Sequence, residues 1–213
     1  MQGDVIIVEE HHRRAAEVIA QQLTPVIRGI GRTYTVSVAG ESGSGKSETA
    51  TALKEALGRR GLKVVILQQD DYFVLPPKSN DRRRREDISW VGTREVRLDL
   101  LDEHLRAARR GEQSITKPLV VYDEDRIRDE ELSVGGLDVV IAEGTYTTAL
   151  QEVDTRIFIQ RDFRDTLEAR KRRNREQFDP YIEQVLEIEH KVISAQGRKA
   201  DTLISRDYEV AFR

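Results

Sequence analysis

The stretch "GESGSGKS", Gly40 to Ser47, decides the fold of this 213-residue chain. It fits the pattern G-x-x-x-x-G-K-[ST] at every position. It also follows the apolar stretch "YTVSVAG" at 34–40 and opens an amphipathic helical pattern at 46–61. A strand, a glycine-rich turn and a helix in this order predict a loop whose backbone N–H groups turn inward around phosphate oxygens.

The residue types of this loop predict its chemistry. Lys46 is expected to reach the terminal phosphates, and the Ser47 hydroxyl to ligate Mg²⁺. We therefore predict that the chain binds a nucleoside triphosphate together with Mg²⁺. The residues expected to hold the nucleotide are Gly40, Ser42, Gly43, Ser44, Gly45, Lys46, Ser47 and Glu48.

Strand and helix patterns alternate along the rest of the chain. Strands are predicted at 34–40, 62–68, 137–144, 155–160 and 201–205, and helices at 15–29, 46–61, 96–111 and 163–194. Such alternation predicts an α/β fold, a three-layer P-loop NTPase fold with a mostly parallel central sheet and helices on both faces. We expect a single domain over 1–213, with residues 1–32 as an N-terminal helical extension.

Composition excludes several classes of protein. The 35 basic and 38 acidic residues leave a net charge of −3, which argues against a nucleic-acid-binding surface. No apolar run approaches the roughly 18 residues of a membrane span, and the N-terminus "MQGDVIIVEEHHRR" carries acids where a signal peptide is basic. Without cysteine, disulfides and thiolate metal sites are impossible. We expect a soluble, cytoplasmic protein.

Two acids follow predicted strands at the edge where ligands of such sheets bind. In "VVILQQDDYFVLPP", residues 64–77, Asp70 comes directly after a strand, where its carboxylate could accept a proton from an acceptor hydroxyl and hold Mg²⁺ through water. The alternative is that Asp70 or Asp71 caps the turn before the two prolines. Glu143 ends another strand and is expected in the same crevice, or else to pair with a structural lysine.

Binding a triphosphate leaves the reaction open. A switch GTPase needs N-K-x-D, and the nearest string, "RKAD" at 198–201, lacks the asparagine. A motor or remodelling ATPase needs more chain than is present. The remaining large class transfers the γ-phosphoryl group to a small acceptor, which requires a positioned hydroxyl, a base and charge neutralisation. A nucleotide-dependent sensor that needs no acceptor is the alternative.

Further motifs resemble the uridine kinase and phosphoribulokinase family over residues 33–210. They occur in the family's order and are the loop, "QDDYF" at 69–73, "YDEDRIR" at 122–128, "VVIAEG" at 139–144, a basic helix at 170–176 and "RKADTLI" at 198–204. The resemblance implies ATP as phosphoryl donor, Asp70 as catalytic base, and Ser47, Asp70 and Glu143 at the Mg²⁺ site. It also implies an acceptor-binding region at 71–136, a helical lid at 161–184 and a homo-oligomer.

The resemblance is weaker at the acceptor. Asp70, Phe73, Tyr122 and Arg126 are the predicted substrate-binding residues. The family's Y-D-x-x-x-H-x-R motif, however, has Ile127 in place of the histidine and Asp129 in place of the arginine. A nucleoside is therefore the first candidate acceptor, and a sugar phosphate, a hydroxy acid such as glycerate, or a pantothenate-like alcohol remain open.

Three basic or aromatic clusters complete the predictions. In the lid, Arg170 and Arg173 are expected to reach the transferred phosphate, the alternative being a solvated helix. "NDRRRRED" at 80–87 is expected to be a solvated loop, or else to recognise an anionic substrate. Trp90 is expected to be half-buried in a packing role, or else to stack on an acceptor ring. His11 and His12 are adjacent, so their rings are expected to point apart, and no transition-metal site is predicted.

Overall fold

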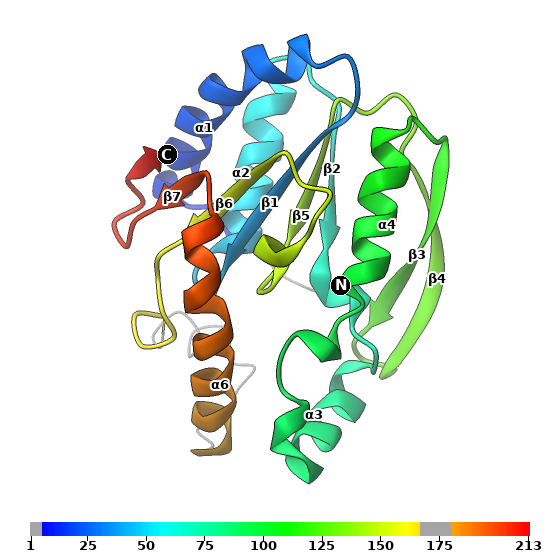
Figure 1. The fold of residues 1–213 in the computed structure, drawn as a ribbon, viewed down its shortest axis with the longest axis vertical. Helices are drawn as coiled ribbons and strands as arrows, with labels where there is room; N and C mark the ends of the chain where they lie inside the picture. The colour runs from blue at the N-terminus through cyan, green and yellow to red at the C-terminus, as the bar shows by residue number, and fades with distance from the viewer. Residues whose placement is uncertain (1–5, 167–179) are drawn as a thin grey trace.

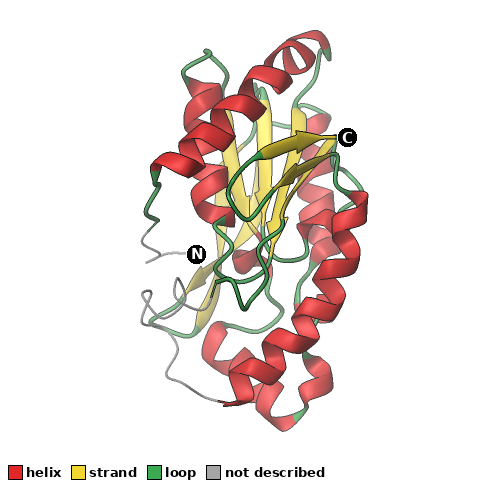
Figure 2. Ribbon diagram, turned by 90° about the vertical axis from the view of Figure 1, so that its left-hand side faces the viewer, coloured by secondary structure: helices red, strands yellow, loops and turns green. Residues whose placement is uncertain are grey.

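The computed structural model describes residues 6–166 and 180–213. A six-stranded sheet has the order β2-β5-β1-β6-β7-β8, parallel except for the last pair (Figure 1). The strands of this sheet are β1 Tyr34–Gly40, β2 Val64–Gln68, β5 Val139–Glu143, β6 Thr155–Ile159, β7 Thr202–Ile204 and β8 Val210–Phe212. Helices cover both faces of the sheet (Figure 2), which confirms the predicted fold class.

The described helices differ in length and position. They are α1 Glu10–Gly29, α2 Lys46–Gly58, α3 Pro77–Glu86, α4 Leu98–Arg109 and α6 Pro180–Gln196, with 3-10 turns η1 Gln69–Tyr72, η2 Ile88–Trp90, η3 Thr93–Glu95, η4 Thr147–Ala149 and η5 Gly197–Lys199. Within the described part of the chain, none of the helices has the length and apolar character to cross a membrane.

Two hydrophobic cores lie on opposite faces of the sheet. Along β5, Val139 and Ile141 point into the core shared with α1 and α2, whereas Val140 and Ala142 point into the core shared with α4 and α6. Side chains of a strand alternate between faces, and a strand covered on both sides is apolar throughout. This is why the central strands are continuous apolar runs in the sequence.

A hairpin outside the main sheet was not predicted. Strands β3 Ser114–Val121 and β4 Arg126–Ser133 pair antiparallel and form a separate two-stranded sheet. β4 is rich in charged, largely exposed residues, so it lacks the apolar signal of the central strands. The predicted loop at 80–87 was also wrong, because these residues belong to α3 and to the turn that follows it.

One side chain of the hairpin turn supports the start of α3. Pro76 occupies the N-cap position and offers no side-chain acceptor there. Instead, Asp125 accepts hydrogen bonds from the backbone N–H groups of Lys78, at 2.7 Å, and Ser79, at 3.3 Å. Asp125 thus acts as a cap supplied from a distant part of the chain, and it joins the hairpin to α3.

We expect Asp125→Ala to lower the free energy of unfolding by about 1 kcal/mol, because the two helix-end N–H groups lose their acceptor. Chemical denaturation measures this change. Asp123→Ala is the matched control, since only the backbone carbonyl of Asp123 bonds Lys78. Equal unfolding curves for the two variants would contradict the capping role.

Candidate active site

The carboxyl ends of three strands bring the phosphate-binding loop, Asp70 and Glu143 together. The phosphate-binding loop follows β1, Asp70 follows β2, and Glu143 is the last residue of β5. β5 lies between β1 and β2, with Val38 of β1 and Gln68 of β2 both in register with Glu143. The three segments therefore meet at one edge of the sheet, where ligands of doubly wound folds bind.

The loop has the backbone of a phosphate site. Gly43 and Gly45 have φ angles of 74° and 93°, a region that L side chains rarely adopt. Gly45 is the N-cap of α2, so the positive end of this helix faces the crevice. The Lys46 ammonium donates to the Glu41 carbonyl oxygen at 3.0 Å, and the buried Ser44 hydroxyl has no hydrogen-bond partner among the described residues.

Residues from both ends of the chain support this loop. The Tyr208 hydroxyl donates to the Ser44 carbonyl oxygen at 3.0 Å, and His12 Nε2 lies 3.1 Å from the same hydroxyl. A Cβ added at Gly45 would lie 2.3 Å from the Tyr208 hydroxyl oxygen. The loop is thus packed between α1 and the segment before β8, a contact for which the sequence carries no motif.

Glu41 ties the loop to two further elements. One carboxylate oxygen accepts the backbone N–H of Phe163 at 2.7 Å, and the other lies 2.6 Å from His190 Nδ1. His190 belongs to α6, more than a hundred residues further along the chain. Sequence reasoning missed both Glu41 and His190, because neither lies in a recognisable pattern with its partner.

Glu143 and Ser47 form the candidate metal site. The Ser47 hydroxyl donates to Glu143 Oε1 at 3.2 Å. Burial raises the pKa of Glu143 to about 7, and the nearby Asp70 charge adds to this, opposed by Lys46 and the Ser47 hydrogen bond. Serine and carboxylate oxygens are ligands that Mg²⁺ prefers, and a cation would supply the positive charge that this buried carboxylate lacks. The residues present therefore fit Mg²⁺.

The two adjacent aspartates have different environments. Asp70 is exposed at the mouth of the crevice. Asp71 is buried; its carboxylate lies 3.0 Å from the Lys117 ammonium and accepts the Val120 N–H at 3.0 Å. Asp71 therefore fastens strand β3 to η1.

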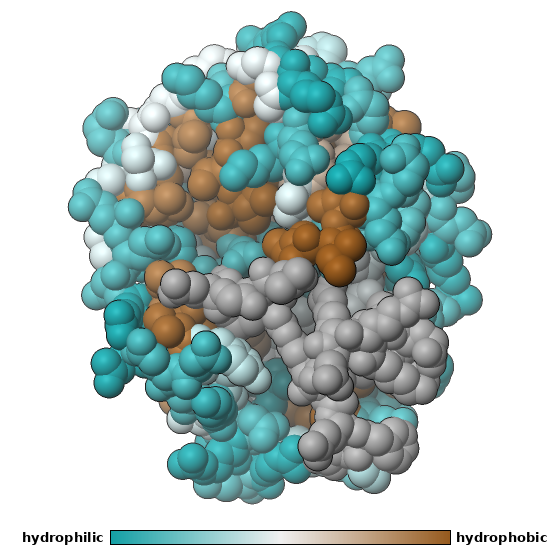
Figure 3. Space-filling model, turned by 180° about the vertical axis from the view of Figure 1, so that it is seen from behind, coloured by the Kyte–Doolittle hydropathy of each residue, from teal (hydrophilic) through white to brown (hydrophobic). Residues whose placement is uncertain are grey.

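A cavity of about 480 Å³ opens beside Ser47 and Glu143. Its polar lining includes Asp71, Lys117 and Glu130, and its apolar lining includes Ile66, Leu119 and Leu132. These apolar residues belong to the free edge of β2 and to the hairpin, on the side where the view from behind shows apolar surface (Figure 3). The cavity thus continues the metal site toward the hairpin.

The remaining predicted residues are more scattered. Phe73 bridges Val96 and packs against the core shared with α4. Tyr122 and Arg126 are exposed at the turn of the hairpin. Glu48 is buried in the first turn of α2, and its charge acts on His11 and Tyr208. Arg170 and Arg173 lie outside the described residues, so their predicted role in the lid stays a prediction.

The arginine cluster of α3 contains one largely buried member. Arg84 ion-pairs with Glu95 through its Nε, and with Glu189 of α6 at 3.0 Å. Asn80 adds a hydrogen bond to Glu95 at 2.7 Å and accepts one from the Trp90 indole at 2.9 Å. Arg84 is therefore a structural cation, and Trp90 is half-buried as predicted.

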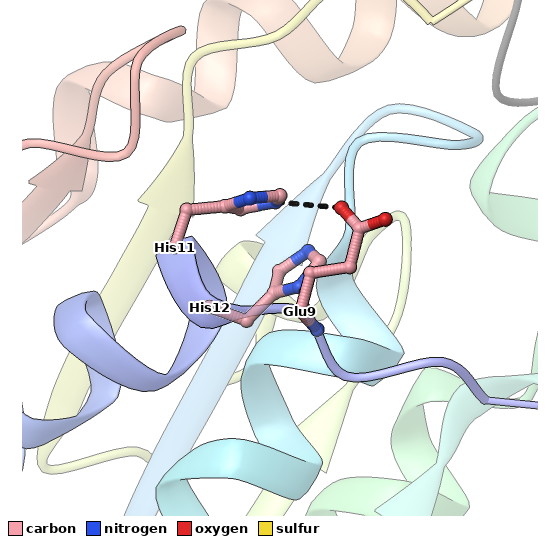
Figure 4. Close-up of side chains that lie close together, drawn as sticks. All are labelled: Glu9, His11 and His12. Carbon is pink, nitrogen blue, oxygen red and sulfur yellow. Dashed lines mark hydrogen bonds and ion pairs between the residues drawn. The ribbon is translucent and has the colours of Figure 1, made fainter.

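Glu9, His11 and His12 cluster at the start of α1 (Figure 4). The prediction that the histidines point apart was wrong, because their ring centroids lie 4.0 Å apart in the first helical turn. The group has metal-ligand types, but His12 Nδ1 accepts the Glu9 N–H at 3.0 Å and its Nε2 contacts Tyr208. His12 Nδ1 thus caps the start of α1, and its Nε2 links α1 to the phosphate-binding loop through Tyr208.

Comparison with models of protein families shows which family the chain resembles. The model of the phosphoribulokinase / uridine kinase family matches residues 35–177. The chain belongs to this family. The predicted family is thereby confirmed, and this member's loop, Asp70 and Glu143 lie within the matched range. The family is one of small-molecule kinases that use a nucleotide.

A curated relative and several solved structures are similar to this family member. The bifunctional alpha-galactosidase/sucrose kinase AgaSK of Mediterraneibacter gnavus is 32% identical over 189 residues, covering 82% of this chain. The chain spans 20% of that protein's length.

The solved structures share the fold at low identity. A protein described as a possible uridine kinase from Bacillus stearothermophilus has a TM-score of 0.63 at 15% identity, covering 90% of this chain and 97% of that one. D-glycerate 3-kinase from Cryptococcus neoformans var. grubii also has a TM-score of 0.63 at 15% identity, covering 96% of this chain and 100% of that one.

We expect Asp71→Asn and Asp70→Asn to differ in stability. Asp71→Asn removes one partner of a buried ion pair, which costs roughly 3 kcal/mol of unfolding free energy. Asp70→Asn alters an exposed carboxylate and should cost less than about 1 kcal/mol. Denaturant unfolding of both variants measures the difference, and equal losses would contradict the assignment of Asp71 as a structural residue.

We expect the free energy of unfolding to fall at acidic pH because His12 is buried in its neutral form. Burial, with the neighbouring His11, lowers the pKa of His12 from 6.5 to about 4. Between pH 6.5 and about pH 4, His12 binds more protons in the unfolded chain than in the folded one. The stability that its neutral, buried form contributes is therefore complete above pH 6.5 and is lost as the pH falls toward 4. The loss should reach roughly 2 to 3 kcal/mol.

His12→Gln should flatten this part of the unfolding profile. NMR titration of the His12 ring measures the pKa directly. A midpoint near 6.5 would disprove the buried, neutral state.

Proposed function

We propose that this chain is a Mg²⁺-dependent phosphotransferase that moves the γ-phosphoryl group of ATP to a hydroxyl of a small metabolite. The observation that carries the proposal is the Ser47–Glu143 contact at 3.2 Å, with the Asp70 charge acting on Glu143, at the open end of the phosphate-binding loop. These groups meet the three requirements of such a transfer: a phosphate cradle, a metal site and a base.

Each residue has a defined part in the proposed mechanism. The loop amides and the Lys46 ammonium bind the β- and γ-phosphates, and Ser47, Glu143 and Asp70 would hold Mg²⁺. When bound, this cation neutralises charge on the phosphates. Asp70 accepts the proton of the acceptor hydroxyl as the oxygen attacks the γ-phosphorus. The bond between the γ-phosphorus and the β–γ bridging oxygen breaks, and ADP leaves.

The proposed acceptor carries sugar-type hydroxyls. The curated relative at 32% identity is named as a sucrose kinase, which supports a carbohydrate acceptor for this chain. A nucleoside is the second candidate, supported by Phe73 after the base and by the fold shared with a possible uridine kinase. Both are small molecules with several hydroxyl groups, so a panel that contains both separates them.

Other parts of the proposal rest on the family resemblance. We propose that residues 161–184 form a lid whose Arg170 and Arg173 stabilise the transferred group, and that the chain assembles with itself. A non-catalytic sensor of nucleotides is the opposing function. Measurement of ADP release with and without acceptors distinguishes the two, because a sensor needs no acceptor.

We expect Asp70→Asn to lower kcat by at least about a hundredfold while ATP binding stays within about threefold, since the base is lost and the loop is intact. Lys46→Ala should weaken ATP binding and turnover together. ADP release and calorimetric titration with ATP measure the two effects. Asp123→Asn is a surface control for Asp70, and transfer at the wild-type rate in Asp70→Asn would remove Asp70 from the mechanism.

A further inference from the structure

Two buried basic side chains flank the crevice, and each is held by two carboxylates. The Lys117 ammonium lies 3.0 Å from both Asp71 and Glu130, and its side chain is 6% exposed. Arg84 ion-pairs with Glu95 and Glu189, and its side chain is 18% exposed. Each group therefore carries one positive charge against two negative ones.

A partner of each group is the sequence neighbour of a residue in the candidate active site. Asp71, the partner of Lys117, is the neighbour of Asp70 in the chain. Glu189, the partner of Arg84, precedes His190, whose Nδ1 lies 2.6 Å from Glu41 in the phosphate-binding loop. The pairs therefore lie beside the loop and the base, where an acceptor must approach the γ-phosphate.

A hydroxyl group lies unpartnered in the same region. Tyr146 is 1% exposed, and its backbone N–H donates to the Gln69 side chain at 2.7 Å, which fixes it next to the start of η1. Its hydroxyl has no hydrogen-bond partner among the described residues. Glu189, Glu95 and Arg84 are close enough for their charges to act on it. A buried hydroxyl of this kind is costly unless a partner, such as an ordered water molecule, pairs with it.

From these contacts we propose that the acceptor is an uncharged molecule with several hydroxyl groups, and that Glu189 is a specificity-determining residue that disfavours acceptors with a phosphate or carboxylate. The inference rests on the proposed function and narrows its substrate class. An anionic acceptor needs a cation of its own, and an unpaired buried charge is strongly unfavourable. Of the largely buried cations that the described residues place beside the crevice, Arg84 and Lys117 are already paired with carboxylates, and Lys46 serves the nucleotide.

Specificity of this kind comes from repulsion as well as attraction. Glu189 gives Arg84 a second carboxylate partner. The positive charge of the guanidinium is therefore already balanced and would not attract an anionic acceptor. A neutral acceptor meets no such penalty. Recognition of an anionic substrate through Arg84 would require its guanidinium to leave both of its carboxylate partners.

The test measures ADP release by the full chain with Mg-ATP and matched acceptors. Sucrose, fructose, glucose and uridine are the neutral set, and fructose 6-phosphate, gluconate, glycerate and ribulose 5-phosphate are the anionic set. We expect the best neutral acceptor to exceed every anionic one at least tenfold in kcat/KM. An anionic acceptor that equals or exceeds it overturns the inference and leaves the proposed kinase function intact. If no acceptor of either set stimulates ADP release, the proposed function itself fails.

Glu189→Gln then tests the residue, with Glu187→Gln on the exposed face of the same helix as the matched control. We expect Glu189→Gln to reduce the preference for neutral over anionic acceptors about fivefold to tenfold, and Glu187→Gln to leave it unchanged. An unchanged preference in a folded Glu189→Gln variant removes Glu189 from the proposal. The wild-type panel decides the substrate class even if that variant does not fold.

Discussion

The parallel pairing of β1 with β5 is the constraint on which the candidate site depends. This pairing sets Val38 opposite Glu143, so the strand that leads into the phosphate-binding loop ends beside the strand that ends in a carboxylate. β2 pairs with the other edge of β5 and brings Asp70 to the same place. A shift of register by one residue would turn Glu143 to the opposite face of the sheet, away from Ser47.

The phosphate-binding loop is fixed by contacts that come from distant parts of the chain. His12 of α1 and Tyr208 near the C-terminus meet at the Ser44 carbonyl, and His190 of α6 meets Glu41. A loop N–H group that points toward a phosphate is not available to stabilise the loop itself. These outside contacts hold it in position, in keeping with the general need to preorganise such sites.

The insertion after β2, residues 69–136, is held by buried charges as well as by the apolar core that it shares with the sheet. Glu95 accepts from Asn80 and from the Gly92 backbone while it ion-pairs with Arg84. Lys117 and Asp125 fasten the hairpin to η1 and to α3. Buried ion pairs require well-matched geometry to offset the cost of desolvation, so they define one arrangement of the insertion relative to the sheet. The acceptor side of the crevice follows from that arrangement.

Local patterns in the sequence determined the phosphate-binding loop, the central parallel strands and the positions of Asp70 and Glu143. Each of these depends on neighbouring residues, on apolar continuity or on glycine at left-handed φ angles, which are properties of short segments. The helical character of 80–86, the β3–β4 hairpin, the buried role of Arg84 and the close contact between the His11 and His12 rings were decided only by the tertiary structure. The partners of Arg84, for example, are Glu95 and Glu189, which lie 11 and 105 residues away in the sequence. Charged residues look alike in a sequence whether water or a carboxylate surrounds them, and only the folded chain determines which.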